Sequence, residues 1–193
     1  MERTFMEKKT YDRMDLKATA LKKAEYDQCI FKHCDFSNAD IAGIKFIDSA
    51  FVDCNLTLAS LTDTTLQHIR FSNCKLWGLR FDTCNKFGLS LSFEGCSLNH
   101  ATFYKTNIKK TIFKNSQLIE TDFTECDLTS SVFEECDLTR ATFDKTIIEK
   151  ADFRTSRNYS IDPERNKVKK AKFSLTQVVG LLDKYDVIIL DGN

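Results

Sequence analysis

A large apolar residue returns at every fifth position through most of this 193-residue chain. One such series runs from Tyr11 to Phe81 without interruption, and a second runs from Phe93 to Phe153. A period of five matches neither the 3.6-residue period of an α-helix nor the two-residue period of a β-strand. A short fixed repeat of this kind indicates a solenoid, in which successive coils stack and bury one continuous core.

The type of residue at these central positions repeats over a longer interval of twenty residues. Because Phe returns above Phe and Leu above Leu only after four pentapeptides, we infer that four pentapeptides make one coil with four short faces. Eight coil-to-coil steps of about 4.8 Å predict a rod roughly 38 Å long. The clearest column contains Tyr11, Phe31, Phe51, Phe71, Phe93, Phe113, Phe133, Phe153 and Phe173.

One interval in this column is longer than the others. The step from Phe71 to Phe93 contains two additional positions, and the columns resume in phase beyond it. The segment 85–91 (NKFGLSL) is therefore predicted to be a two-residue bulge within one coil. We interpret residues 1–173 as a single repeat domain that contains this bulge.

The stretches CDFSNAD (34–40), ECDLTSSVF (125–133) and ECDLTRATF (135–143) carry the repeat most clearly. They resemble the pentapeptide repeat family, whose pattern is A(D/N)LxX, and the resemblance covers residues 11–173. It implies an all-β solenoid, namely a right-handed quadrilateral parallel β-helix of about eight coils. The handedness is implied by the resemblance alone, because the spacing of residues does not determine it.

Eight cysteines lie two positions before the centre of a pentapeptide, where the side chain is expected to point into a crowded corner. None has the CxxC spacing of a zinc or redox motif. We interpret them as small buried packing residues, with a metal or redox site as the alternative. Free thiols suit a reducing compartment, so a cytoplasmic protein without metal or cofactor is expected. These residues are Cys29, Cys34, Cys54, Cys74, Cys84, Cys96, Cys126 and Cys136.

The sequence favours a non-enzymatic protein without catalytic residues. His33, His68 and His100 lie two positions after a central residue, so they are expected to face solvent on separate parts of the rod. No Ser–His–Asp arrangement, phosphate-binding loop or GxGxxG motif occurs, and a regular β-helix offers no cleft. The net charge is zero and no apolar run is long enough to cross a bilayer, so neither direct nucleic-acid binding nor a membrane span is expected.

The segment 117–152 contains ten acidic side chains and only three basic ones. One interpretation is structural: Lys105, Glu125 and Lys145 alternate in sign up one column, which allows ion pairs between coils. The other interpretation is a partner-binding acidic patch. Its candidate residues, the last three of which have no clear basic partner in their columns, are Glu125, Asp127, Glu135 and Asp137.

Two aromatic residues near the bulge form a second candidate contact surface. Trp77 is the only tryptophan and lies next to a central position, and Phe87 lies within the bulge. Together they are predicted to make an apolar partner-binding patch. The alternative is that both residues pack locally against the bulge.

The repeat weakens after Phe153. The segment 158–166 (NYSIDPERN) is polar and contains the only proline, so it is predicted to be a loop. Ser174 and Gln177 have the spacing of a capping box, which predicts a short helix over 175–185. The apolar run at 187–190 (VIIL) predicts a strand after it.

Residues 174–193 are expected to cover the open end of the solenoid, because an uncovered end exposes unpaired backbone groups. The tail either covers its own last coil or joins two chains in a two-fold homodimer, which we favour. The candidate dimerisation residues are Leu175, Val178, Val179, Leu182, Val187 and Ile189.

Repeats and tail together resemble the quinolone-resistance members of the family, which bind DNA gyrase as dimeric DNA mimics. The resemblance implies a cytoplasmic protein-binding module that contacts gyrase or a related topoisomerase through the acidic residues. A structural or interaction scaffold with an unrelated protein partner is the alternative. A continuous acidic stripe would favour mimicry, and a checkerboard of charges would favour the scaffold.

Overall fold

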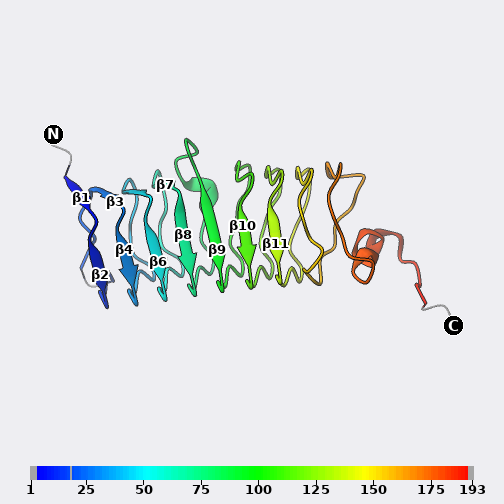
Figure 1. Cartoon of the computed structure of the whole chain (residues 1–193), viewed down its shortest axis with the longest axis horizontal. Helices are drawn as coiled ribbons and strands as arrows, with labels where there is room; N and C mark the ends of the chain where they lie inside the picture. The colour runs from blue at the N-terminus through cyan, green and yellow to red at the C-terminus, as the bar shows by residue number, and fades with distance from the viewer. Residues whose placement is uncertain (1–3, 18, 191–193) are drawn as a thin grey trace.

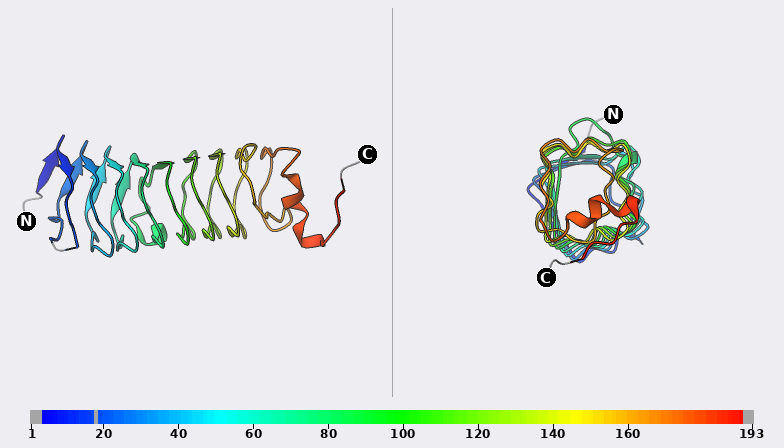
Figure 2. Two further views of the ribbon diagram at one scale, coloured as in Figure 1. Left: turned by 90° about the horizontal axis from the view of Figure 1, so that it is seen from below. Right: turned by 90° about the vertical axis from the view of Figure 1, so that its right-hand side faces the viewer.

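The computed structural model describes residues 4–17 and 19–190, which form a straight rod of stacked coils (Figure 1). Seen along its axis, the coils superimpose in a four-sided outline (Figure 2). All strand pairs are parallel, and most join positions exactly one four-pentapeptide coil apart, as Phe31 pairs with Phe51. The predicted quadrilateral parallel β-helix is therefore confirmed.

Two of the four faces contain regular strands. Face 1 holds a four-stranded sheet, and face 2 holds a seven-stranded sheet. The strands of face 1 are β1 (Phe5–Glu7), β3 (Glu25–Asp27), β5 (Lys45–Ile47) and β7 (Thr65–Gln67). Those of face 2 are β2 (Thr10–Asp12), β4 (Ile30–Lys32), β6 (Ala50–Val52), β8 (Ile69–Ser72), β9 (Leu91–Glu94), β10 (Ile112–Lys114) and β11 (Val132–Glu134).

The next two faces along the chain are held by isolated parallel bridges. Face 3 contains the bridge between Asp35 and Asn55, and face 4 contains the bridge between Asp40 and Ser60. A short 3-10 helix, η1 (Phe81–Thr83), also lies on face 4. The seven strands of face 2 make six steps of regular sheet, and bridges at Asp152 and Lys172 continue the stack. The number of fully stranded coils is thus slightly lower than the predicted number of coils.

Stacked phenylalanine rings fill the interior. On face 2 neighbouring rings of the column lie nearly parallel, as for Phe93 and Phe113, with centroids 5.0 Å apart. A second column on face 4 stacks in the same way, and Phe103 meets Phe113 edge to face at 6.0 Å. Faces 2 and 4 are opposite, so the two columns meet across the rod. Large rings with favourable pair geometry explain why Phe dominates these positions.

Most corners are turned by a residue with a left-handed backbone, and most of these residues are not glycine. His33, Glu125 and Lys150 are examples, with φ of 52°, 55° and 59°. Each such residue costs about 1 kcal/mol. Its N–H donates to a carbonyl of the next coil, as from His33 to Val52 at 3.0 Å. These bonds offset the strain, which is why a chain with only six glycines forms so many turns.

The strand offset changes at one place. The pairing of β8 with β9 skips two additional residues, so that Ile69 lies opposite Leu91. These residues lie in a loop that projects beyond the four-sided outline (Figure 2). Gly88 has a φ of +71°, and a Cβ there would lie 2.5 Å from Nε2 of Gln67, so a larger residue would displace the Gln67 side chain.

The prediction of a helix over 175–185 and a strand over 187–190 is wrong in its details. Two 3-10 helices, η2 (Val178–Leu181) and η3 (Asp183–Tyr185), replace the α-helix, and residues 187–190 belong to no strand. The carbonyl of Gly180 accepts a hydrogen bond from the N–H of Ile161 at 2.9 Å. This contact with the last coil uses a carbonyl that would otherwise accept a hydrogen bond within an α-helix. Among the described residues, no strand edge pairs with 187–190.

The stacked rings predict that Phe→Ala substitutions at a buried and at an exposed position differ greatly in their effect on the free energy of unfolding. Phe113→Ala should lower the free energy of unfolding by about 3–5 kcal/mol, because Phe113 is buried between two stacked neighbours. Phe87→Ala is the matched control: this side chain is 82% exposed, so the change should stay within about 0.5 kcal/mol. Urea unfolding followed by circular dichroism measures both. Equal shifts of the two midpoints would contradict the proposed core.

Candidate partner-binding surfaces

The four candidate acidic residues do not form one patch. Residues ten positions apart lie on opposite sides of a twenty-residue coil. Glu125 and Asp127 therefore flank the corner between faces 4 and 1, whereas Glu135 and Asp137 flank the corner between faces 2 and 3. The sequence grouped them because they are close along the chain, but the coil separates them across the width of the rod.

Three of these four carboxylates form ion pairs with an adjacent coil. Lys105 lies 3.4 Å from Glu125, Lys109 lies 3.1 Å from Asp127, and Arg157 lies 3.2 Å from Asp137. The expectation that Asp127 and Asp137 lack partners is therefore wrong. Among the described residues, Glu135 alone of the four has no basic partner within ion-pair distance.

Asp127 and Asp137 also have a structural role within their own pentapeptides. Oδ1 of Asp137 accepts hydrogen bonds from the Thr139 backbone N–H at 3.1 Å and from the Thr139 hydroxyl at 2.6 Å. Asp127 makes the same two bonds with Thr129. The acid of the ECDLT stretches therefore closes the turn that follows it. It is less available to a partner than its charge suggests.

The environment of Asp137 favours its ionised form. Burial raises the pKa of this carboxyl, but the hydrogen bonds from Thr139 and Asn158 and the charge of Arg157 outweigh burial. The pKa therefore lies below its ordinary value. The carboxylate remains charged and bonded throughout the neutral range.

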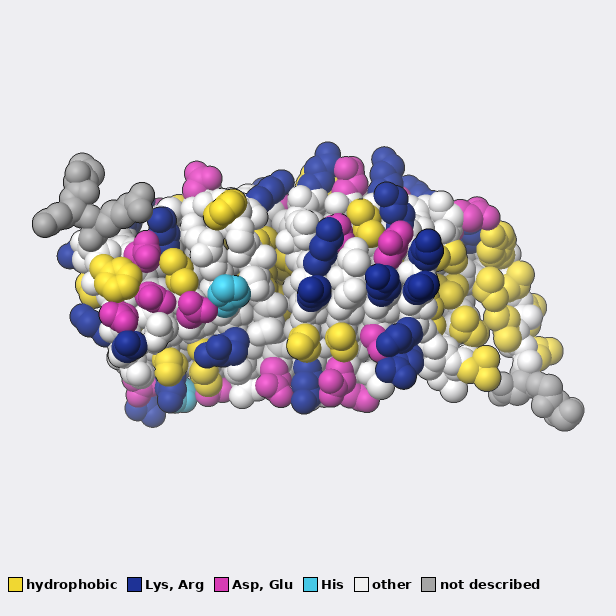
Figure 3. Space-filling view, turned by 45° about the horizontal axis from the view of Figure 1, so that its top comes forward, with side chains coloured by type: hydrophobic (Ala, Val, Ile, Leu, Met, Phe, Trp, Pro, Cys, Tyr) yellow, Lys and Arg dark blue, Asp and Glu magenta, His cyan; other side chains and the backbone are white. Residues whose placement is uncertain are grey.

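Charges over much of the rod alternate between coils. Lys114 lies 3.7 Å from both Glu94 and Glu134, the acids below and above it in the column. Arg140 lies 3.1 Å from Glu120 in another column. Acidic and basic side chains both occur on the side shown in Figure 3, with the basic ones gathered toward the C-terminal end. In these columns the described residues thus form a checkerboard rather than a continuous acidic stripe.

The histidines face solvent, as predicted, and each lies near a carboxylate of an adjacent coil. His33 lies between Asp12 at 2.8 Å and Asp53 at 3.6 Å. His68 and His100 have one carboxylate each, at 3.0 and 3.3 Å. Within the described part of the chain, no group of three or more potential ligands has a metal-binding arrangement.

All eight cysteines are buried and unpaired, so their predicted packing role is confirmed. Five of the thiols donate to carbonyl groups of the coil below, as from Cys74 to Phe51 at 3.4 Å. Burial raises the pKa of Cys84, Cys126 and Cys136 to about 12. These thiols are therefore protonated and shielded from solvent reagents.

Trp77 and Phe87 do not share a patch, because they lie on opposite faces. Trp77 is on face 3, where its Nε1 donates to the hydroxyl of Ser97 at 2.5 Å. Phe87 is on face 1 at the projecting loop, where its carbonyl accepts from Gln67 at 3.3 Å. The predicted joint patch is wrong, and Phe87 remains as an isolated exposed ring.

The C-terminal segment covers the last coil of its own chain (Figure 1). The side chain of Gln177 accepts the N–H of Asn158 at 3.2 Å, while the Ser174 hydroxyl accepts the N–H of Gln177 at 3.3 Å. Lys184 pairs with Asp162 at 2.8 Å and also with Glu164. The first of the two expected arrangements, capping of the same chain, is therefore present.

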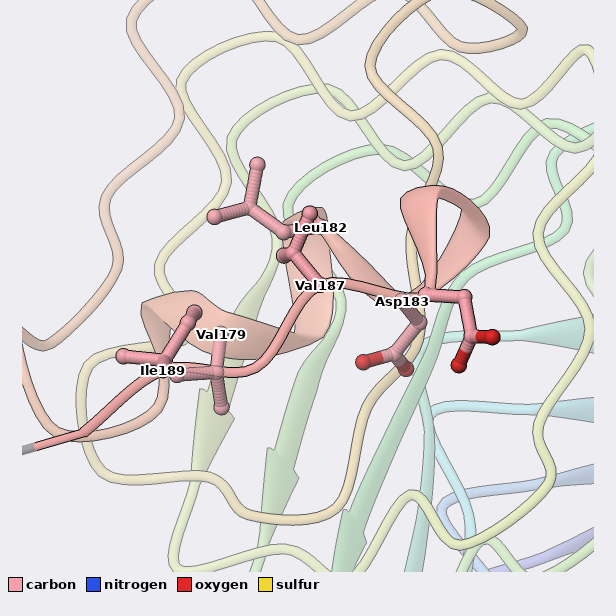
Figure 4. A pocket seen from close by; sticks show the side chains of 6 residues that line it. Val179, Leu182, Asp183, Val187 and Ile189 are labelled. Carbon is pink, nitrogen blue, oxygen red and sulfur yellow. The ribbon is translucent and has the colours of Figure 1, made fainter.

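The outer side of this cap remains apolar. A hollow there is lined by Val179, Leu182, Asp183, Asp186, Val187 and Ile189 (Figure 4). Of the six candidate dimerisation residues, Val178 is half-buried and the other five are exposed, with Leu175 at 90%. Ile188 and Leu190, which were not among the candidates, extend the exposed apolar surface. The sequence held a signal for both residues, because they belong to the same apolar run at 187–190 as Val187 and Ile189.

No helix among the described residues is long and apolar enough to span a lipid bilayer.

Comparison with known proteins identifies the repeat. Residues 24–88 and 89–160 match the pentapeptide repeat region family. A curated relative, the quinolone resistance pentapeptide repeat protein QnrB96 of Scandinavium goeteborgense, is 35% identical over 88 residues. That match spans 42% of this chain and 38% of the relative, so the chain matches well under half of the relative's length.

Two solved structures show the same fold. A trypsin-treated variant of QnrB1, a plasmid-mediated fluoroquinolone resistance protein, has a TM-score of 0.64 at 17% identity, covering 97% of this chain and 98% of the other. HetL, involved in heterocyst differentiation regulation in Nostoc sp. strain PCC 7120, has a TM-score of 0.50 at 14% identity. The structural match covers 89% of this chain and 84% of HetL.

The turn-closing role of Asp137 predicts a pH-dependent loss of stability on substitution. Asp137→Ala should lower the free energy of unfolding at pH 7 by about 1–2 kcal/mol, because it removes the bonds to Thr139 and Arg157. Asp137→Asn should cost less, since its amide oxygen still accepts from Thr139.

Because the folded pKa of Asp137 is lowered, its contribution is complete above the unfolded pKa near 3.9 and is lost as the pH falls through the folded value. Urea unfolding of wild type and Asp137→Ala between pH 7 and about pH 3 measures this. A stability difference that does not shrink at low pH would show that the charge of Asp137 is irrelevant.

Proposed function

The chain belongs to the pentapeptide repeat family, and we propose that it acts as a non-enzymatic protein-binding module that contacts DNA gyrase or a related topoisomerase. The local identity with a quinolone resistance protein carries this proposal. The full-length likeness in shape to QnrB1 is consistent with it.

The geometry of the rod supports contact with a protein that holds duplex DNA. Eight steps of about 4.8 Å give a length equal to about 11 base pairs at 3.4 Å per pair. The acidic pairs Glu125 with Asp127 and Glu135 with Asp137 lie on opposite corners, as the two phosphate backbones lie on opposite sides of a duplex. Glu135 is the least neutralised member, so we assign it the largest share of contact with a basic partner surface.

A scaffold function with another protein partner is the second candidate. The ion pairs between coils favour it, because they neutralise most of the carboxylates that a DNA mimic needs. HetL, with a related fold, is described as taking part in regulation of differentiation. The two candidates differ in whether a topoisomerase is bound.

Gyrase supercoiling assays with and without a fluoroquinolone test the first candidate. Micromolar protein should bind gyrase and change either its supercoiling activity or its inhibition by the drug. The double substitution Glu125→Lys/Glu135→Lys should weaken binding by about tenfold or more, because it reverses both acidic corners. Glu7→Lys/Glu25→Lys, an equal charge change at the far N-terminal end, serves as the control and should have little effect.

Absence of binding, inhibition and protection at micromolar protein would overturn the topoisomerase proposal. A stable complex with an unrelated protein, isolated by pull-down from cytosol, would then support the scaffold. Equal weakening by Glu7→Lys/Glu25→Lys would show that only total charge matters.

We further propose that two chains associate through the outer side of the C-terminal cap. The exposed apolar residues Val179, Leu182, Val187 and Ile189 form one surface around the hollow (Figure 4). A contiguous apolar surface of this kind is characteristic of an interface. A two-fold arrangement would bury the same residues of both chains and double the length of the rod.

Light scattering coupled to gel filtration tests this dimer. The wild type should elute as a dimer, and Val187→Asp/Ile189→Asp should be monomeric because it places two carboxylates in the interface. Leu58→Asp changes an exposed leucine elsewhere on the rod and should remain dimeric. A monomeric wild type, or loss of the dimer in Leu58→Asp, would contradict the assignment.

A further inference from the structure

Face 1 carries an excess of lysine over its C-terminal half. Five lysines there are exposed, and none forms an ion pair with the described residues, in contrast to the alternating columns elsewhere. Figure 3 shows basic side chains gathered in this region. We call this set the lysine stripe. It consists of Lys110, Lys150, Lys167, Lys169 and Lys170.

One row of the stripe, at the edge of face 1, does not follow the alternation of charge seen elsewhere on the rod. Lys110, Ser130, Lys150 and Lys170 occupy equivalent corners of successive coils, each with φ close to 60°. Lys150 and Lys170 are therefore direct neighbours, about 4.8 Å apart along the stack. Like charges on adjacent strands are unfavourable. A row that costs stability, in a chain that elsewhere pairs opposite charges, indicates a surface kept for binding.

Few acids compensate the stripe. On this part of face 1, Asp127 is paired with Lys109 at 3.1 Å, and Glu149 lies between Thr129 and Lys169 in the adjacent row. Even with both acids counted, the stripe and Lys109 retain four uncompensated positive charges. The zero net charge of the whole chain, from which we expected no nucleic-acid contact, conceals this local imbalance.

An exposed aromatic ring lies at one end of the stripe. Phe87 is 82% exposed on face 1, one coil before Lys109 and Lys110. Nζ of Lys86 donates to the carbonyl of Lys105 at 3.3 Å, which ties the loop that carries Phe87 to that next coil. The ring therefore lies on the same face as the lysine stripe, one coil before its first lysine.

We propose that face 1 binds single-stranded nucleic acid, with phosphates along the lysine stripe and a base stacked on Phe87. Positive grooves or stripes combined with exposed aromatic rings are the usual means by which proteins hold single strands. The isolated exposed ring favours a single strand over a duplex, whose bases are already stacked. This inference does not depend on topoisomerase binding.

Fluorescence anisotropy with a labelled oligothymidylate of about 20 nucleotides tests the proposal at low salt. The wild type should bind with micromolar affinity, and the affinity should fall steeply with salt. Lys150→Glu/Lys170→Glu should weaken binding by about tenfold or more and reduce the magnitude of the logarithmic salt slope by roughly 1.4, the value for two phosphate contacts. Lys32→Glu/Lys75→Glu changes charge equally on other faces and should bind like wild type.

The aromatic contact has its own test. Phe87→Ala should weaken binding to oligothymidylate by about fivefold or more, but should not weaken binding to an abasic oligomer of the same length. Circular dichroism and thermal unfolding confirm that each variant is folded. Equal loss on both oligomers, or on neither, would overturn the stacking contact.

Three results would overturn the proposal as a whole. The first is no binding of oligothymidylate at low salt by folded wild-type protein. The second is an equal loss of affinity in the control double variant, which would reveal attraction by total charge only. The third is binding to vesicles of anionic phospholipid or to duplex DNA that is tighter than binding to the single strand.

Discussion

Each coil of this protein is stabilised by the coils on either side of it. Backbone N–H groups donate to carbonyls of the next coil, and the phenylalanine rings stack at the same spacing, so every coil must present similar residues at similar places. This requirement accounts for the left-handed corners, since one donated hydrogen bond per corner offsets the strain of a non-glycine residue. It also explains the buried thiols, which fit the narrow corner and of which five donate to the coil below.

The same stacking governs the charges. A side chain on the surface has its nearest neighbours one full coil away along the chain, so an acid is best placed above or below a base. Most candidate acidic residues follow this rule and are paired, and some also close turns, as Asp137 does. Surfaces that break the rule are therefore more informative about binding. Glu135, the lysine stripe and the apolar outer side of the cap are the places where stacking does not explain the residues.

The architecture was predictable because it depends on two short periods that can be read directly. The columns, the buried cysteines and the longer interval between Phe71 and Phe93 all follow from counting along the chain. The joint acidic patch and the pairing of Trp77 with Phe87 were wrong for one reason: closeness in sequence was taken for closeness in space, although half a coil spans the rod. The prediction for the tail was wrong for another reason. Its helical pattern was real, but Gly180 docks on the last coil and turns the segment into 3-10 helix.

The order of amino acids was sufficient to establish the solenoid, its four faces and the residues that fill its core, because each coil repeats the same local interactions. The folded rod was needed to show which surface residues share a corner, which carboxylates are neutralised and how the tail covers the end. These features depend on contacts between different coils, and on a segment that does not repeat. Periodicity carries no information about such a segment, since it has no equivalent in the next coil.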